Sequence, residues 1–342
     1  MDTTVIVLGA SGFGYHHLVN IAKLSKTHPR LAPDHIAFTT TSPESYQSTM
    51  DRFGKTVSTF DFEYPSISGH TVKKPNDLEH LFQELRHDDI KLITSAVPYA
   101  VQCEYLKDCA LRAPTILEKP SGSPTGGLVV SDFLKEIQAG TQYHDIGLEL
   151  PVALIREQMP GTEVLETYRN SHRVKAWWSS VGKLEDIYEI VKADLGPHAL
   201  SWLPIGSKIV KGKRESNFGI EFEDTYKDFE VYFERVKEGE DVFKGVQLHI
   251  GHKVVNYVIV DGPDYINELR VLHDGYKMES VKNNPGDLAA KSDPTGIEVK
   301  NPLGENLIRA MGGDMVTDLG QMIVEQDNLE KLFKYGANRK YK

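Results

Sequence analysis

Short apolar runs alternate with helical spacings through the first third of the chain. Residues 4–8 form the first run, which ends at a glycine, and apolar positions three and four apart follow from Tyr15. Further apolar runs at 35–39, 91–97 and 114–118 are separated by helical patterns. Strands that alternate with helices form parallel sheets covered on both faces, so we expect a doubly wound α/β domain.

The segment 119–127 is rich in proline, glycine and serine and interrupts this alternation. Such a composition is typical of a connection between domains. We therefore place a domain boundary between residues 122 and 123. Residues 1–122 are expected to form the doubly wound domain, and residues 123–342 a second domain of the α+β class.

The pattern after this boundary favours strands that follow one another directly. Residues 217–234, 242–250 and 253–260 are predicted to be strands joined by short polar turns, which indicates a large, mostly antiparallel sheet. The polar stretch 283–300 is expected to be a loop. Residues 307–333 have helical spacing that glycines interrupt.

Composition and charge exclude several classes of function. The 342 residues are 40% hydrophobic and 26% charged, and 39 basic against 49 acidic side chains give a net charge of −10, which disfavours nucleic acid as a partner. No apolar run approaches the ~18 residues of a membrane span, and the first residues do not resemble a signal peptide, so we expect a cytoplasmic protein without membrane contact.

The histidines and cysteines do not have metal-ligand spacing. His16 and His17 are adjacent on a predicted helix and face different directions, so we interpret them as surface or cleft-lining residues. Cys103 and Cys109 fit neither a redox pair nor a zinc motif, and both are expected to be reduced packing residues. We expect no metal site.

A glycine-rich segment joins the first predicted strand to the first helix. Gly9 and Gly14 occupy the first and third glycine places of GxGxxG, Ser11 stands at the second, and Gly12 and Phe13 complete the segment. In this context the backbone amides at the helix start can bind a pyrophosphate, which predicts a dinucleotide cofactor. The alternative is an ordinary tight turn.

The residues after the second predicted strand bear on the choice of cofactor. NAD-binding folds usually place Asp or Glu there to bind the ribose hydroxyls, whereas this chain has Thr40, Thr41 and Ser42. Small hydroxyl residues leave room for a 2′-phosphate, with Arg52 or Lys55 as counter-charge. NADP is therefore favoured over NAD, and the alternative is a polar loop.

Two later groups offer proton-transfer chemistry. Glu118 and Lys119 lie at the carboxyl end of a predicted parallel strand, where such sheets bind ligands, although a lysine before proline is usually solvated. Asp194 and His198 are four residues apart, so the acid can orient or charge the imidazole; Asp194 could equally cap a helix. Oxidation of an alcohol by a nicotinamide requires a proton acceptor near the hydroxyl, and lysine and histidine suit that role.

In their order and approximate spacing these motifs resemble the Gfo/Idh/MocA family (glucose-fructose oxidoreductase, inositol dehydrogenase and rhizopine-catabolism proteins) of NAD(P)-dependent oxidoreductases. The matching segments are 9–14, 95–98, 118–120 and 194–198. The resemblance implies a Rossmann domain followed by a domain with a large sheet, an active site between the two, and a homodimer or homotetramer formed through that sheet.

The resemblance also implies roles for individual residues. Lys119 and His198 would flank the substrate carbinol, with Asp194 as partner, and one of them would move the hydroxyl proton while hydride moves to or from the nicotinamide. The cofactor contacts implied by the resemblance are Gly9, Ser11, Gly12, Phe13, Gly14, Thr40, Thr41, Ser42, Ala96, Pro98, Gln102, Glu118 and Lys119.

The expected activity is hydride transfer between NADP or NAD and a secondary alcohol or ketone of a sugar, cyclitol or related polyol. The chain departs from the family pattern at Tyr99, at Gln102, which occupies a histidine place, and over 147–152. These departures leave two alternatives: a catalytically silent dinucleotide-binding regulator, and a reductase of an imine or conjugated double bond. Trp177, Trp178 and Trp202 are interpreted as core or interface residues rather than faces for a sugar ring.

Overall fold

The computed structural model describes residues 2–86, 88–120, 130–149, 151–182, 188–214, 216–262, 266–283 and 287–336. Contacts between Cα atoms divide the chain into two compact units. The first unit contains Met1–Glu149 and Leu303–Met322, and the second contains Leu150–Pro302 and Ile323–Lys342. The boundary expected between residues 122 and 123 lies outside the described residues.

The first unit is built on a six-stranded parallel sheet with the order β3-β2-β1-β4-β5-β6. This order confirms the predicted doubly wound fold, because the chain starts in the middle of the sheet and proceeds outward in both directions. The strands are β1 (Thr3–Leu8), β2 (His35–Thr40), β3 (Ser66–Thr71), β4 (Asp89–Ser95), β5 (Thr115–Glu118) and β6 (Ile146–Glu149).

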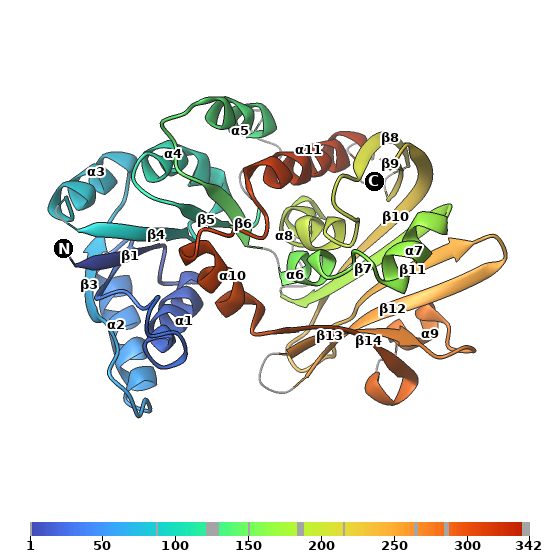
Figure 1. Ribbon diagram of the computed structural model, residues 1–342, viewed down its shortest axis with the longest axis horizontal. Coiled ribbons are helices and arrows are strands. Elements are labelled where there is room, and N and C mark those ends of the chain that lie inside the picture. Colours follow the sequence, from blue (N-terminus) through green and yellow to red (C-terminus); the bar gives the residue numbers. More distant parts are fainter. Residues whose placement is uncertain are drawn as a thin grey trace. The chain divides into compact units, whose positions relative to one another are not determined.

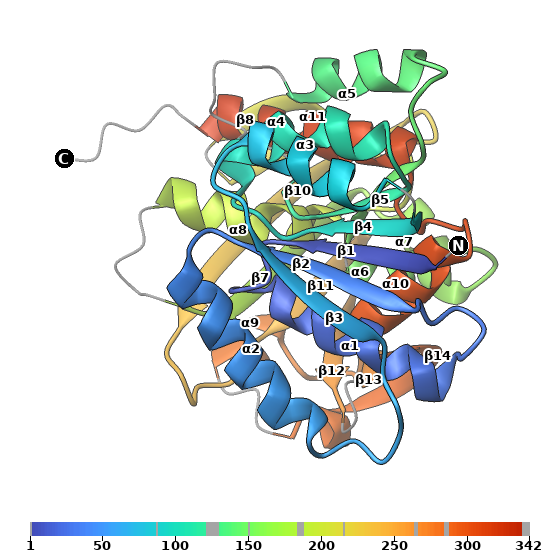
Figure 2. The same cartoon turned by 90° about the vertical axis from the view of Figure 1, so that its left-hand side faces the viewer.

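Helices cover both faces of this sheet (Figure 2). Alternate residues of β1 enter two cores: Val5 and Val7 pack with α1 (Gly14–Thr27), α2 (Pro43–Val57) and α10 (Pro302–Met311). Ile6 and Leu8 pack with α3 (Pro75–Glu84) and α4 (Tyr99–Ala110) on the other face. Burial on both faces explains why the strand is a continuous apolar run. A further helix, α5 (Val130–Ala139), connects β5 to β6.

The second unit is built on an eight-stranded sheet with the order β14-β13-β12-β11-β7-β10-β9-β8 (Figure 1). Only the β7–β10 pair is parallel among the pairs described, so the expectation of a large, mostly antiparallel sheet is confirmed. The strands are β7 (Arg173–Val181), β8 (Lys208–Arg214), β9 (Asn217–Phe222), β10 (Thr225–Val236), β11 (Lys244–Ile250), β12 (Lys253–Asp261), β13 (Ile266–Leu272) and β14 (Ser292–Lys300).

Among the helices of this unit, α8 (Tyr188–Leu200) packs on β7 and β10 at the centre of the sheet. α9 (Met278–Asn283) covers the opposite face, where Trp177 shares a core with Met278 and Val281. The remaining helices are α6 (Pro151–Glu157), α7 (Glu163–Asn170), the short 3-10 helix η2 (Ala289–Lys291) and α11 (Leu319–Gly336). The chain passes from the first unit to the second within α11, after Met322.

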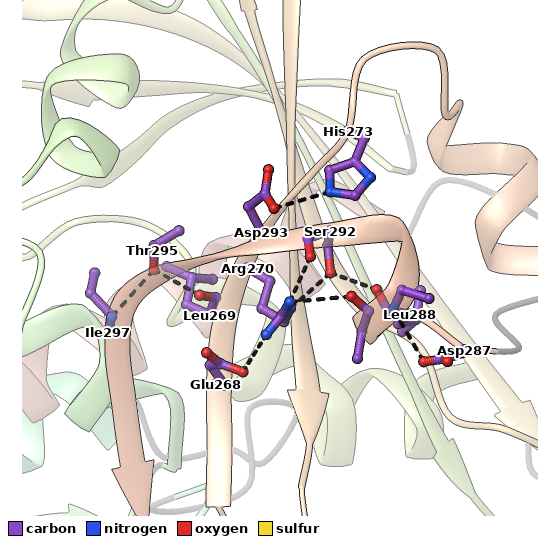
Figure 3. A network of polar contacts seen from close by, with 12 residues as sticks. Glu268, Leu269, Arg270, His273, Asp287, Leu288, Ser292, Asp293, Thr295 and Ile297 are labelled. Atoms are coloured by element: carbon purple, nitrogen blue, oxygen red, sulfur yellow. Dashed lines mark hydrogen bonds and ion pairs between the residues drawn. The ribbon is translucent and has the colours of Figure 1, made fainter.

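The prediction of a loop over 283–300 is wrong for its second half, which forms the edge strand β14. Side-chain hydrogen bonds hold this polar strand, as Figure 3 shows: Arg270 Nε donates to Ser292 Oγ (2.9 Å) and Thr295 Oγ1 donates to the Leu269 carbonyl (2.7 Å). The register shifts between Leu269 and Arg270, so the bulge interrupts the alternation that would have indicated a strand.

Candidate functional site

The glycine turn is packed tightly against its neighbouring strands. Gly9 has a φ of +77°, and a Cβ there would lie 2.9 Å from the Ala96 carbonyl oxygen. A Cβ on Gly14 would lie 2.7 Å from the Gly9 carbonyl oxygen. The Gly9 amide donates to Thr39 Oγ1 (3.1 Å) and the Ala10 amide to the Thr39 carbonyl (2.9 Å). Only glycine fits the two ends of this turn.

The middle of the turn, by contrast, is open. Ser11, Gly12 and Phe13 are exposed, and a Cβ built on Gly12 would meet nothing within 4 Å. Phe13, at the N-cap of α1, makes no side-chain capping bond, and the first turn of α1 contains no acidic residue. The partial positive charge of the helix start is therefore available to an anion such as a pyrophosphate.

The hydroxyl residues after β2 have different surroundings. Thr40 is buried and donates to the Ser42 carbonyl (3.1 Å), and Thr41 is exposed. Ser42 Oγ accepts from the Ser45 amide (3.1 Å), so Ser42 caps α2. Of these three candidate cofactor contacts, only Thr41 has a side chain that the structure shows to be exposed.

A hollow of about 370 Å³ lies beside the turn, lined by Ser11, Tyr15, Glu44, Ser45, Ser48, Thr49 and Arg52. The Arg52 guanidinium lies over the Tyr15 ring at 3.7 Å from its centroid, and the Tyr15 hydroxyl donates to the Arg52 carbonyl (3.1 Å). Of the two expected counter-charges, Arg52 thus lines the hollow, whereas Lys55 is not among its lining residues. Burial, followed by the charges of Arg52 and His17, lowers the pKa of nearby His16.

A buried polar cluster lies at the carboxyl end of β5. Gln102 Nε2 donates to the Glu118 carbonyl (2.9 Å), and His17 Nε2 lies 3.7 Å from Glu118 Oε1. His17 is fully buried, so its interpretation as a surface or cleft-lining residue is wrong, because α1 turns it toward β5. Lys119 follows, half-buried, and the Lys119–Pro120 bond is cis. Ala96 contacts the glycine turn, and Pro98 precedes α4 and is exposed.

The second group of candidate residues lies on α8, at the centre of the second unit. The His198 imidazole stacks on the Trp178 indole, with ring centroids 4.7 Å apart and planes 5° from parallel. Asp194, one helical turn earlier, accepts a hydrogen bond from Arg235 Nη2 of β10 (2.7 Å). Lys119 belongs to the first compact unit and His198 to the second.

Sequence reasoning missed two residues that contact the candidate pair on α8: Trp178 stacks on His198, and Arg235 donates to Asp194. Trp178 and Arg235 are far from His198 along the chain, and no motif spacing indicates them. Trp177, Trp178 and Trp202 are all buried, as expected of core residues. Trp177 stacks on Tyr232, with centroids 5.2 Å apart, so neither adjacent tryptophan presents a bare ring face.

The described residues contain neither a cluster suited to a metal ion nor a membrane-spanning helix. Within the described ranges, no group of three or more His, Cys, Asp and Glu side chains is placed to hold a metal ion. Within the described residues, Cys103 and Cys109 are not joined in a disulfide. No helix in the part of the chain that the structure describes is long and apolar enough to cross a membrane.

Comparisons with known proteins reveal likeness in structure only. No protein-family model and no curated protein matches the chain. UDP-N-acetylglucosamine 3-dehydrogenase GnnA from Acidithiobacillus ferrooxidans is similar in fold, with a TM-score of 0.63, 10% identity and coverage of 98% of both chains.

Two further solved structures agree with this comparison. KijD10, a 3-ketoreductase from Actinomadura kijaniata in complex with NADP, has a TM-score of 0.61 at 10% identity and covers 98% of both chains. Levoglucosan dehydrogenase in complex with NADH has a TM-score of 0.61 at 12% identity, over 98% of this chain and 97% of that one. The chain therefore has the fold of these oxidoreductases, which confirms the fold that the resemblance to the Gfo/Idh/MocA family implied.

Proposed function

We propose that the protein is an NAD(P)-dependent oxidoreductase that transfers hydride between a nicotinamide and a secondary alcohol or ketone of a sugar, cyclitol or related polyol. One observation carries the proposal: the open glycine turn follows β1, Lys119 follows β5, and β4 lies between these strands in one parallel sheet. Both features therefore lie at the carboxyl edge of the sheet, where doubly wound folds bind dinucleotides.

The residues of this edge fit a dinucleotide. The amides of Ser11, Gly12 and Phe13 would bind the pyrophosphate at the start of α1. Ala96, Pro98, Gln102 and Glu118 would border the nicotinamide end, with the Gln102 side chain holding the backbone of β5 in place. The bound nicotinamide supplies or accepts the hydride.

Proton transfer is assigned to basic side chains. Oxidation of a secondary alcohol removes a hydride from carbon and a proton from oxygen, so a base must accept that proton. We assign this role to Lys119 and His198, and Asp194 acts with His198 as its partner on α8. In reduction the same groups return the proton to the oxygen.

The substrate class and the cofactor preference are finer parts of the proposal. Two of the three similar structures have a sugar in their name or ligand, namely UDP-N-acetylglucosamine 3-dehydrogenase and levoglucosan dehydrogenase with L-sorbose. The third is a 3-ketoreductase with TDP-benzene. NADP is favoured over NAD because Arg52 lines the hollow beside Ser11, although the Glu44 carboxylate lines it too. The homodimer or homotetramer through the large sheet and the cytoplasmic location stay predictions.

The experiment combines binding and turnover. NADPH and NADH are titrated against the purified protein by nicotinamide fluorescence, and a panel of polyols and sugars is then followed at 340 nm. We expect micromolar binding with turnover on at least one panel member. Failure of both dinucleotides to bind would overturn the proposal, whereas binding without turnover of any substrate would favour the silent regulator.

Two substitutions test the residue assignments. Lys119→Met and His198→Gln should each lower turnover by about 10²–10⁴-fold while dinucleotide affinity stays within about 3-fold, since general acid–base groups act on the transition state. Lys23→Met, at an exposed position of α1, is the control. Near-normal turnover in either variant would remove that residue from the mechanism.

A further inference from the structure

We propose that Trp178 is a positioning residue for His198, whose ring plane it sets. This inference rests on the proposed function, in which His198 transfers a proton. The two rings are nearly parallel, 5° apart, with centroids separated by 4.7 Å. Both side chains are buried, Trp178 being 6% and His198 9% exposed.

The helix that carries His198 does not by itself fix the imidazole. α8 determines where the Cα–Cβ bond points, but rotation about χ2 of histidine has broad, two-fold minima. Contact with a flat indole selects the orientations in which the imidazole lies parallel to it. Because both ring nitrogens lie in the imidazole plane, the indole thereby restricts the directions in which His198 exchanges a proton.

The indole is itself held firmly by the sheet. Trp178 lies on β7, paired with Phe233 of β10 on one side and Lys244 of β11 on the other. Lys244 Nζ lies 5.5 Å from the indole centroid and forms an ion pair with Asp261 (2.7 Å). Trp178 therefore belongs to the rigid centre of the unit, and an imidazole that stacks on it inherits that rigidity.

A second contact fixes the same helix one turn earlier. Arg235 of β10 donates to Asp194, and its side chain is only 11% exposed. The sheet thus holds α8 at two successive turns, once through an ion pair and once through the stacked ring. The ion pair acts on the helix, whereas the stack acts on the imidazole itself.

The competing explanation is that Trp178 fills the core and nothing more. Trp177 offers a matched control, because it is the next residue of β7, is equally buried at 6% exposure, and stacks on Tyr232 instead of His198. Successive residues of a strand point to opposite faces of the sheet. Trp177→Leu and Trp178→Leu therefore remove the same side-chain volume, but only Trp178→Leu removes the ring that stacks on His198.

The first measurement does not depend on activity. Histidine ring protons are observed by NMR in protein with isotope-labelled histidine, and those of His198 are assigned by their loss in His198→Gln. The stacked indole should shift them upfield through its ring current. Trp178→Leu should move them toward ordinary values, Trp178→Phe should keep part of the shift, and Trp177→Leu should leave them unchanged. Unmoved His198 resonances in Trp178→Leu would overturn the inference.

The second measurement is kinetic, on a substrate that the panel identifies. Trp178→Leu should lower kcat by about 10–100-fold, the cost of a small misplacement of a catalytic group, with NADPH affinity unchanged. Trp178→Phe should restore most of the rate, and Trp177→Leu should keep it despite a similar fall in melting temperature. Equal rates in Trp178→Leu and Trp177→Leu would overturn the inference.

The controls separate this inference from the proposed function. If His198→Gln turns over normally, the assignment of His198 fails, and the NMR shift alone then reports whether the stack exists. If His198→Gln is inactive while Trp178→Leu retains its rate, only the positioning role fails. If Trp178→Leu does not fold, Trp178→Phe is used for both the NMR and the kinetic measurement, with smaller expected changes in chemical shift and kcat.

Discussion

The two candidate parts of the site are built in opposite ways. The turn from Gly9 to Gly14 is one contiguous segment whose function depends on backbone geometry and on the absence of side chains. The contacts of Asp194 and His198 on α8 come from side chains of β10 and β7, which meet them only after folding. A site made of backbone is therefore encoded locally, whereas a site made of side chains depends on the folding of the whole unit.

The largest expected effect lies within the turn. Gly14→Ala should lower the free energy of unfolding by about 1–3 kcal/mol, because its Cβ would overlap a backbone oxygen. Gly9→Ala adds a positive-φ cost of about 1–2 kcal/mol. Gly12→Ala should change stability by less than about 0.5 kcal/mol, since its Cβ meets open space. Urea denaturation measures the free energy of unfolding of all three variants. Equal losses of stability in the three would contradict a turn with two packed ends and an open middle.

An intermediate effect is expected at the anchor of α8. Arg235→Met removes the charged donor to Asp194, and we expect a loss of about 1–2 kcal/mol in the free energy of unfolding. Combining it with Asp194→Asn should cost less than the two single changes added together, because the residues interact. The control is Lys26→Met, which breaks an exposed ion pair with Asp61 and should cost less than about 0.5 kcal/mol. Additive losses would contradict a direct interaction at α8.

The smallest expected effect concerns cofactor preference. Arg52→Met should weaken NADPH binding about 3–10-fold and leave NADH binding unchanged, because a largely exposed charge is screened by solvent and salt. Lys55→Met, on the same helix but outside the hollow, is the matched control. Titration at low and high salt checks the electrostatic origin. An equal loss for both nucleotides would assign Arg52 to the turn itself rather than to the 2′-phosphate.

Sequence reasoning succeeded where the cause is local. The first sheet was predictable because strands buried on both faces are continuous apolar runs, as at Val5–Leu8. It failed at β14, where a bulge and polar partners remove the period-two pattern. It also misjudged His17, since adjacent helix positions differ in burial according to what the helix covers. Here α1 packs on β1, β2 and β4 and turns His17 inward, toward Glu118.

The glycine turn, the parallel sheet to which it belongs and the position of Glu118–Lys119 at the carboxyl end of a strand can be read from the sequence, because each depends on residues close together in the chain. The folded structure was needed to show that Trp178 stacks on His198, that Arg235 binds Asp194, and that Arg52 rather than Lys55 lines the hollow. The physical reason is that side-chain contacts between distant segments depend on register and helix rotation, which packing of the whole unit determines.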